Sequence, residues 1–175
     1  MGSDPVKAPG HAEPPTYTRR VRRFNLHAAE AEYDGADPEG YRAGMARFGK
    51  EIGARMIGGT VYELPAGQSN CAFHYEYGNE EWLIVLDGRP TLRHAGGEDE
   101  LAPGDVVCFP PGPAGVHKVM NRSDATARVL LLSTQQEPAV VVYPDSDKIG
   151  VWPGERRDNI LVRRESNVDY WDREQ

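Results

Sequence analysis

The stretch that decides the fold is Phe73-His74-Tyr75-Glu76-Tyr77-Gly78-Asn79-Glu80-Glu81-Trp82-Leu83-Ile84-Val85-Leu86-Asp87-Gly88. His74 and Glu76 are two residues apart, so in a β-strand both side chains leave the same face. The apolar run after Glu81 is typical of a second strand, and Asp87-Gly88 is typical of the turn that ends it. The stretch therefore predicts two neighbouring strands, one of which presents an imidazole and a carboxylate side by side.

A second stretch with turn and strand character follows about thirty residues later in the chain. It reads Gly104-Asp105-Val106-Val107-Cys108-Phe109-Pro110-Pro111-Gly112, and His117 and Asn121 come after it. Its glycines and prolines are typical of tight turns, and the apolar residues between them are typical of a strand. Together the two stretches predict that two histidines and two or three carboxylates converge inside one barrel.

Short apolar runs separated by turn residues continue on both sides of these stretches. Each run has the length of a strand, and the connections contain Gly, Pro, Asn and Asp. This spacing is typical of an antiparallel sandwich or barrel, so we predict an all-β fold. The predicted strands are 52–57, 60–64, 72–76, 82–86, 91–94, 98–101, 105–109, 117–121, 128–134 and 140–143.

The barrel is predicted to span residues 51–145, with a tail and an irregular arm before it at 1–50 and a C-terminal extension at 146–175 that packs on it. Residues 1 to about 16 are rich in proline and poor in large apolar groups, so we expect them to be disordered. Asp37 and Pro38 favour the start of a helix running to residue 48. An edge strand is predicted at 160–163, and the aromatic segment 168–171 is expected to dock on another surface.

Length, charge and cysteine content limit the classes of function. The chain has 175 residues, which fits one domain, and a net charge of −7, which disfavours nucleic acid and anionic membranes as partners. The basic cluster from Arg19 to Arg23 is interpreted as a solvated or dimer-contacting arm. No apolar run reaches the ~20 residues of a membrane span, and no signal sequence is visible, so we expect a cytoplasmic protein. Cys71 and Cys108 lack the spacing of a disulfide framework or a structural zinc site.

Residues 129–132 are apolar at successive positions, so this strand is predicted to be buried on both faces. A partner subunit is one candidate for the second cover, because monomers rarely leave a large apolar sheet face in water. We therefore expect a homodimer.

The two stretches resemble the motifs of the cupin superfamily. Its first motif is a glycine, His-x-His, four residues, a glutamate, six residues and a glycine, which here correspond to Gly67, His74, Glu76, Glu81 and Gly88. Its second motif corresponds to Gly104, Pro110, Gly112, His117 and Asn121. The chain departs from the pattern at Glu76, where the family usually has histidine, and in two gaps, which are one and two residues longer than usual. The resemblance covers roughly residues 55 to 145.

This resemblance implies a double-stranded β-helix, or jelly roll, and a metal site. The family positions that match His74, Glu81 and His117 are metal ligands, and we expect Glu76 to be a fourth ligand to one divalent ion. Imidazole and carboxylate ligands suit Mn, Fe(II), Ni or Zn. By alternation only one of Glu80 and Glu81 faces inward, and the spacing favours Glu81.

Two functions remain open. One is a mononuclear-metal enzyme, of oxygenase, isomerase or lyase type, for a small organic acid or sugar-like substrate. The other is a non-catalytic module that binds or senses a small ligand. If no metal is bound, Glu76 either pairs with a histidine or acts as a general base, because burial in a barrel raises the pKa of a carboxyl group. For that reason Glu76 is also our candidate catalytic residue.

Overall fold

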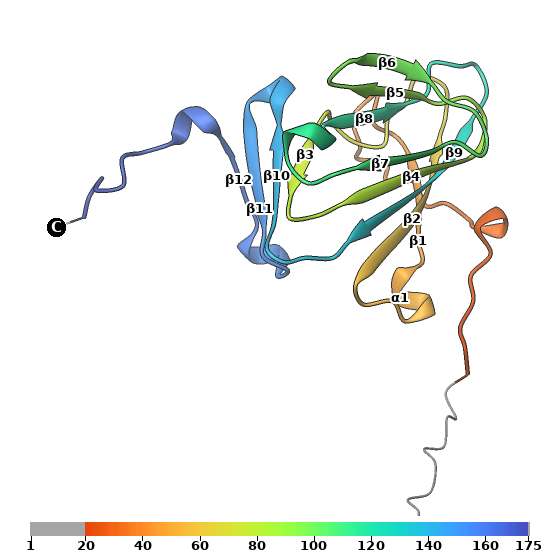
Figure 1. Ribbon diagram of the computed structural model, residues 1–175, viewed down its shortest axis with the longest axis horizontal. Coiled ribbons are helices and arrows are strands. Elements are labelled where there is room, and N and C mark those ends of the chain that lie inside the picture. The colour runs from red at the N-terminus through yellow and green to blue at the C-terminus, as the bar shows by residue number, and fades with distance from the viewer. Residues whose placement is uncertain (1–19, 175) are drawn as a thin grey trace, which may run out of the picture.

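The computed structural model describes residues 20–174, and the tail predicted for residues 1–16 lies outside this range, as does Arg19. Most regular structure is β-strand (Figure 1). The strands are β1 (Gly44–Arg47), β2 (Ile57–Leu64), β3 (Tyr75–Tyr77), β4 (Glu81–Asp87), β5 (Thr91–His94), β6 (Gly97–Glu100), β7 (Val106–Phe109), β8 (His117–Met120), β9 (Ala127–Thr134), β10 (Ala139–Tyr143), β11 (Lys148–Trp152) and β12 (Ile160–Arg163). One α-helical turn, α1 (Gly49–Ile52), and five 3-10 turns complete the described part: η1 (Leu26–Ala28), η2 (Pro113–Gly115), η3 (Pro144–Ser146), η4 (Arg156–Asp158) and η5 (Arg164–Ser166).

The strands form antiparallel sheets in the orders β1-β2-β9-β4-β7, β12-β11-β10-β3 and β6-β5-β8. His74 and His117 form an isolated antiparallel bridge, with backbone N to O distances of 3.0 and 2.8 Å, which connects the second sheet to the third. The five-stranded sheet thus faces a second layer built from the other two. This arrangement is a double-stranded β-helix, and the predicted all-β jelly roll is confirmed.

The core lies between the two layers and follows the alternation of the strands. On β4, Leu83 and Val85 point inward and are 0% and 2% exposed, and they meet Val119 and Val129 from β8 and β9. Burial of each such Val or Leu side chain stabilises the fold by about 1.5–3 kcal/mol. The inward face of β4 therefore fixes the position of Glu81, the residue at which this strand begins.

The outer face of the five-stranded sheet has a cover from within the chain. Val61 and Leu130 pack there with Phe48 and Ala29, and Phe24 stacks on Phe48 with ring centroids 4.8 Å apart. The second cover predicted for residues 129–132 is thus the N-terminal arm together with the segment around α1. This cover does not reach Trp82 on β4 and Val106 on β7, which lie on the same face and are 42% and 55% exposed.

Three local predictions were wrong or incomplete. Residues 44–47 are strand β1, not part of a helix, because Met45 and Arg47 pair with β2 and an isolated short helix is only marginally stable. The strand predicted from residue 52 begins at Ile57, because residues 49–52 form α1 and Gly53 caps this helix in a left-handed conformation. The predictions did not include β11.

The C-terminal extension has two parts. Strand β11 pairs with β10 and continues its sheet, and the predicted edge strand at 160–163 is confirmed as β12. Residues 153–174 are exposed, including Tyr170 and Trp171 at 81% and 71%, so the aromatic segment docks on no other part of the described chain. None of the helices in residues 20–174 has the length and apolar character needed to cross a membrane.

Candidate metal centre

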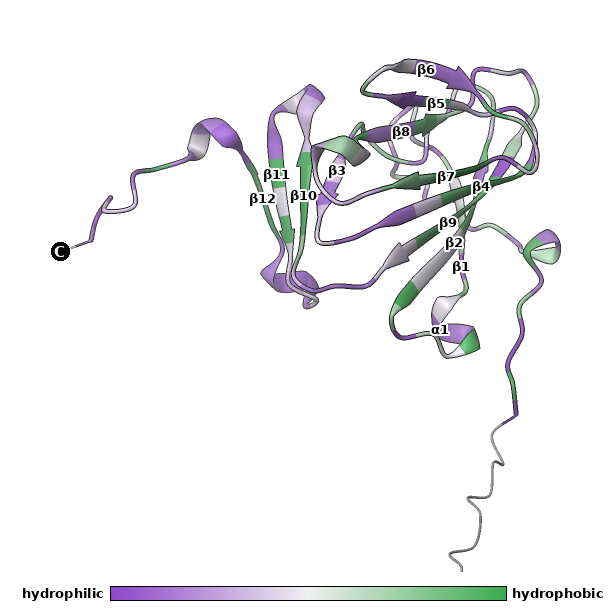
Figure 2. Ribbon diagram, viewed as in Figure 1, coloured by the Kyte–Doolittle hydropathy of each residue, from purple (hydrophilic) through white to green (hydrophobic). Residues whose placement is uncertain are grey.

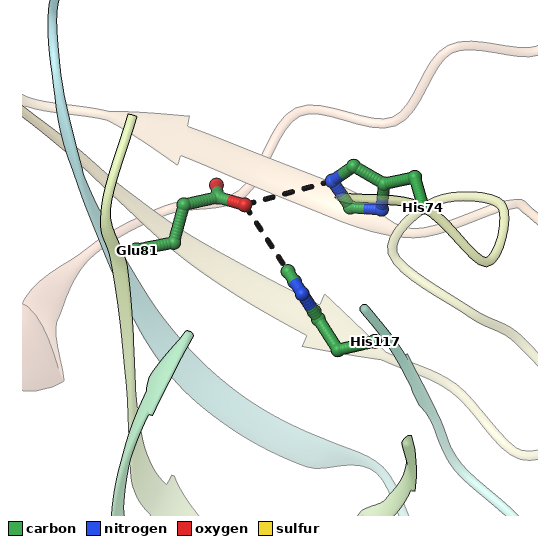
Figure 3. Close-up of side chains that lie close together, drawn as sticks. All are labelled: His74, Glu81 and His117. Atoms are coloured by element: carbon green, nitrogen blue, oxygen red, sulfur yellow. Dashed lines mark ion pairs between the residues drawn. The ribbon is translucent and has the colours of Figure 1, made fainter. Parts of the chain in front are cut away.

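Three of the predicted ligands converge at one point of the barrel (Figure 3). His74 directly precedes β3, Glu81 is the first residue of β4, and His117 is the first residue of β8. Glu81 Oε2 lies 3.6 Å from Nε2 of His74 and 3.7 Å from Nε2 of His117. One ligand atom from each residue lies within 4.8 Å of the other two, a span that one ion can bridge.

The second ring nitrogen of each histidine is held by a backbone carbonyl. His117 Nδ1 is 2.9 Å from Gly115 O, and His74 Nδ1 is 3.0 Å from Ala72 O. A carbonyl oxygen only accepts, so both Nδ1 atoms carry the hydrogen and donate it. In the neutral rings the lone pairs are therefore on the Nε2 atoms, which face Glu81. Histidine ligands in metal sites are oriented in this way.

His117 has no freedom to turn away from this point. Its side chain is 1% exposed and stacks on Phe109 with ring centroids 3.6 Å apart and planes at 4°. Its Nε2 is buried and has no hydrogen-bond partner within the described residues. A buried, unpaired lone pair costs free energy, and a cation at this position would offset that cost.

The electrostatics of the three residues are strongly coupled. Burial, together with neighbouring His74, lowers the pKa of His117 to about 4, so its ring is neutral near pH 7. Burial also acts to lower the pKa of His74, but Cys71 and Glu81 outweigh it and raise that pKa to about 11. Burial acts to raise the pKa of Glu81, and the two histidines outweigh it and lower that pKa. Without a metal, a proton on His74 thus balances the Glu81 carboxylate.

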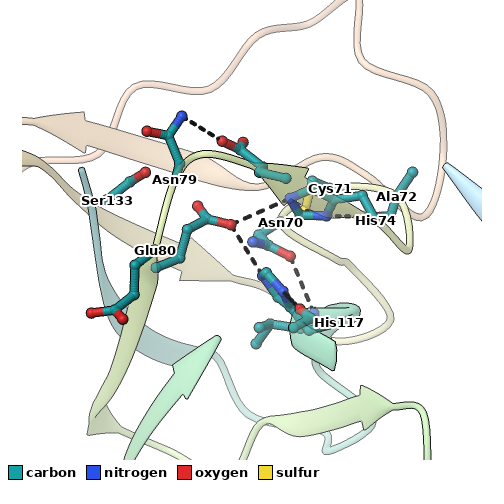
Figure 4. Close-up of polar contacts among 12 residues, drawn as sticks. Asn70, Cys71, Ala72, His74, Asn79, Glu80, His117 and Ser133 are labelled. Carbon is teal, nitrogen blue, oxygen red and sulfur yellow. Dashed lines mark hydrogen bonds and ion pairs between the residues drawn. The ribbon is translucent and has the colours of Figure 1, made fainter. Parts of the chain in front are cut away.

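Glu76 lies beside this group but not in it. Its side chain leaves the middle of β3, and its Oε2 accepts a 2.8 Å hydrogen bond from Asn79 Nδ2 (Figure 4). Asn79 Oδ1 in turn accepts hydrogen bonds from Thr134 Oγ1 and the backbone N of Gln136, at 3.1 and 2.9 Å. Burial and the charge of Glu81 raise the pKa of Glu76. The structure thus brings together three of the four predicted ligands. The carboxylate of the fourth, Glu76, is instead hydrogen-bonded to the side-chain amide of Asn79.

The neighbouring carboxylate, Glu80, is placed elsewhere. It accepts a 2.7 Å hydrogen bond from the indole of Trp82, whereas Glu81 enters the cluster. This is the result expected from strand alternation.

The cluster opens into a pocket of about 490 Å³. His74, Glu76, Glu81 and His117 line it together with polar side chains from β2, β9 and neighbouring loops. Arg47 and Lys50 also line it, and neither joins an ion pair with any residue between 20 and 174. The pocket thus combines carboxylates and histidines with two cations that have no acidic partner in the described chain. The other polar lining residues are Thr60, Asn70, Ser133 and Gln135.

Sequence reasoning missed three residues, of which Arg47 and Lys50 line this pocket and Asn79 holds the lining residue Glu76. Asn79 belongs to no ligand pattern, and only its hydrogen bond to Glu76 reveals its role. Arg47 was part of a predicted helix, and its pocket position follows from the pairing of β1 with β2. Lys50 lies on α1, whereas the sequence predicted it as the last residue of the irregular arm.

Comparison with known proteins agrees with this geometry. A family model described as a cupin domain matches residues 60–133, which include all three residues of the cluster. No curated protein matches the chain.

Several solved structures share the fold. A protein from Silicibacter pomeroyi, described as a sugar phosphate isomerase from a cupin superfamily, is 23% identical with a TM-score of 0.72; the match covers 86% of this chain and 98% of that one. A protein from Acidithiobacillus ferrooxidans, also described as a sugar phosphate isomerase, is 25% identical with a TM-score of 0.72, covering 82% and 91%. A polyketide cyclase from Streptomyces resistomycificus is 21% identical with a TM-score of 0.56, covering 69% and 84%.

Proposed function

The chain contains a cupin domain, and on this premise we propose that His74, Glu81 and His117 bind one divalent transition-metal ion in an enzyme for a small, oxygen-rich substrate. The observation that carries the proposal is the convergence of three donor atoms, two of them Nε2 atoms whose rings are fixed by backbone carbonyls. Such a donor set suits Mn, Fe(II), Ni or Zn.

The number of protein ligands supports an enzyme over a storage site. Catalytic metal sites typically use three protein ligands and keep a position open, and here the pocket adjoins the three ligand side chains. A bound ion would polarise a carbonyl or hydroxyl oxygen of the substrate. Glu76 is a further carboxylate in the same pocket, with a raised pKa and no place among the three converging groups. It is the candidate to move a proton.

The substrate we propose is a sugar-like acid, in which an anionic phosphate or carboxylate accompanies hydroxyl and carbonyl groups. Arg47 and Lys50 provide charges for the anion, and the amides and hydroxyls of the pocket provide partners for the oxygens. The description of a 25% identical protein as a sugar phosphate isomerase supports this class. In an isomerisation, Glu76 would take a proton from the hydroxyl-bearing carbon next to the carbonyl and return it to the former carbonyl carbon, while the hydroxyl proton moves from the oxygen of the first carbon to the oxygen of the second.

Replacing Glu76 with glutamine tests this role. We expect Glu76→Gln to keep the metal but to lower the rate by roughly 10²–10⁴-fold, because an amide cannot accept the proton. The measurement is the incorporation of solvent deuterium into aldose and ketose phosphates and sugar acids, followed by NMR with the metal-loaded protein. Glu80→Gln, which changes a carboxylate bonded to Trp82, is the matched control and should behave as the parent.

Three other results would change the assignment. Loss of metal from Glu76→Gln would make Glu76 the fourth ligand. Full activity with metal retained would remove Glu76 from proton transfer. Metal-loaded parent protein that binds these compounds without any exchange or conversion would instead be a ligand-binding module.

Metal binding should depend steeply on pH, because the ion replaces the proton on His74. The folded pKa of His74, about 11, lies above its ordinary value of 6.5, so the proton is bound throughout the neutral range and is released only as pH rises. We expect the affinity for Mn²⁺ to rise about tenfold per pH unit between roughly pH 7 and pH 9. Calorimetry in buffers of different ionisation enthalpy should detect release of about one proton per ion. An affinity that is flat over this range would contradict the protonated state of His74.

We further propose that the protein acts as a homodimer in the cytoplasm and binds neither nucleic acid nor membranes. The net charge of −7 supports the last two points.

A further inference from the structure

One sheet face outside the site is apolar across all four strands of the β12-β11-β10-β3 sheet. Residues that pair directly across strands point to the same face. Glu76, on β3, pairs with Val141 and points into the pocket, so its strand neighbours Tyr75 and Tyr77 point outward. The two outward rows are Tyr77, Val140, Val151 and Ile160, and Tyr75, Val142, Ile149 and Val162. We call these eight residues the outer face.

The outer face is only partly covered by its own chain. Tyr75 and Val142 are buried, but Tyr77, Ile160 and Val162 are 47%, 52% and 41% exposed. Figure 2 shows hydrophobic colour along β10, β11 and β12. Strand β12 also exposes Leu161, at 53%, on its opposite side, and its outer edge pairs with no strand of residues 20–174. An apolar edge strand of this kind is a site for association.

The C-terminal arm, which we define as residues 167–174, leaves β12 through η5 and runs away from the barrel (Figure 1). It exposes Val168, Tyr170 and Trp171 at 64%, 81% and 71%. Two large aromatic side chains and a valine are thus left without cover by the described residues of their own chain. Exposed apolar residues at this density mark a contact surface.

We propose that a second copy of the chain occupies the outer face and that the C-terminal arm of each copy crosses onto the outer face of the other. The two surfaces are complementary within one sequence, which is what a two-fold symmetric interface requires. The arm has eight residues and reaches about 26 Å when extended, whereas four strands span only about 14 Å. An arm can therefore cross the whole face of its partner.

The distribution of charge supports the same occupant. The arm carries three acidic residues and one arginine. Residues 155–165, around β12, carry exposed arginines at 156, 157, 163 and 164 and acidic residues at 155, 158 and 165, so the net charge of this segment is +1 against −2 for the arm. An acidic arm crossing a partner would meet these arginines at the rim of the apolar face, where exposed ion pairs guide association.

The area that a stable dimer must bury explains why the outer face and the C-terminal arm are both needed. A stable dimer buries roughly 800 Å² on each copy. Eight side chains on a sheet, three of which are about half exposed, supply only part of this area. Tyr170 and Trp171 each add about 150–250 Å² when covered. Removal of the arm should therefore abolish a stable dimer even though the outer face stays intact.

Sedimentation of the full-length protein over a range of concentrations tests the proposal. We expect a dimer down to about 1 µM, and an increase of at least 100-fold in the dissociation constant for a chain ending at Ser166 and for Ile160→Glu. Val106→Glu is the matched control. Val106 is 55% exposed on β7, an edge strand of the five-stranded sheet, and this substitution should leave the dimer unchanged. Circular dichroism confirms that each variant is folded.

Each other outcome overturns part or all of the proposal. A full-length protein that is monomeric at about 100 µM excludes the dimer. Dissociation of the dimer by Val106→Glu but not by Ile160→Glu would place the interface on the five-stranded sheet. A dimer that survives truncation at Ser166 but not Ile160→Glu would show that the arm does not cross. Metal content is measured in parallel and should not change, so a failure here is distinguishable from a failure of the metal site.

Discussion

His117→Ala is expected to abolish metal binding while the protein stays folded. The Nε2 atom of His117 is one of three converging ligand atoms, and its ring is fixed by Phe109 and by the carbonyl of Gly115. Loss of a residue that only orients a ligand lowers metal affinity by about 10–100-fold, so loss of the ligand itself should lower it by more than 100-fold. Elemental analysis of untagged protein gives the metal content, and calorimetric titration with Mn²⁺ or Zn²⁺ gives the affinity.

The matched control is His94→Ala, which removes a histidine that pairs with Asp99 outside the cluster. It should bind metal as the parent does. Because alanine leaves a cavity beside Phe109, Glu81→Gln provides a second variant of nearly unchanged volume and should also lose the ion. Parent-like metal content in both His117→Ala and Glu81→Gln would place the ion elsewhere.

The second large effect is expected for Gly115→Ala, a change in the turn that delivers His117. A Cβ at this position would overlap the backbone carbonyl oxygen of Pro110, so the backbone itself must move. Forced overpacking of this kind costs about 1–3 kcal/mol of unfolding free energy, and we expect the upper end because no flexible side chain can yield. Metal affinity should fall as well, by about 10–100-fold, because Gly115 O accepts the hydrogen bond from His117 Nδ1.

Chemical denaturation and metal titration measure the two effects. Gly35→Ala is the control, because a Cβ there would have open space around it. Parent-like stability and affinity in Gly115→Ala would mean that the turn adapts, and that its carbonyl does not position the ring.

The spacing of the two motifs predicted that His74, Glu81 and His117 converge, and the reason is physical. A strand period of two fixes which side chains share a face, and the turns at Gly78 and Gly112 bring the strand beginnings together. The same period allowed only one of Glu80 and Glu81 to point inward, and the motif spacing favoured Glu81, which lies in the cluster. The period also placed Glu76 on the correct face of β3.

Alternation does not show how far a side chain reaches or what holds it. Glu76 is bound by Asn79, a contact between a strand and a loop that no period encodes. The residues that cover Leu130 could not be predicted from the sequence either, because an apolar run indicates that a strand face is buried but not which segment buries it. Residues 44–47 became a strand because an edge of β2 was available, which is a tertiary effect.

The most direct test of the metal site is anomalous diffraction from a crystal of the full-length protein loaded with Mn²⁺ or Zn²⁺. We expect one peak about 2.0–2.3 Å from Nε2 of His74, Nε2 of His117 and a carboxylate oxygen of Glu81. The distance from this peak to Glu76 would also show whether that carboxylate is a ligand or a free base. The absence of a peak at the cluster after loading with either ion, or a peak held by other residues, would contradict the account.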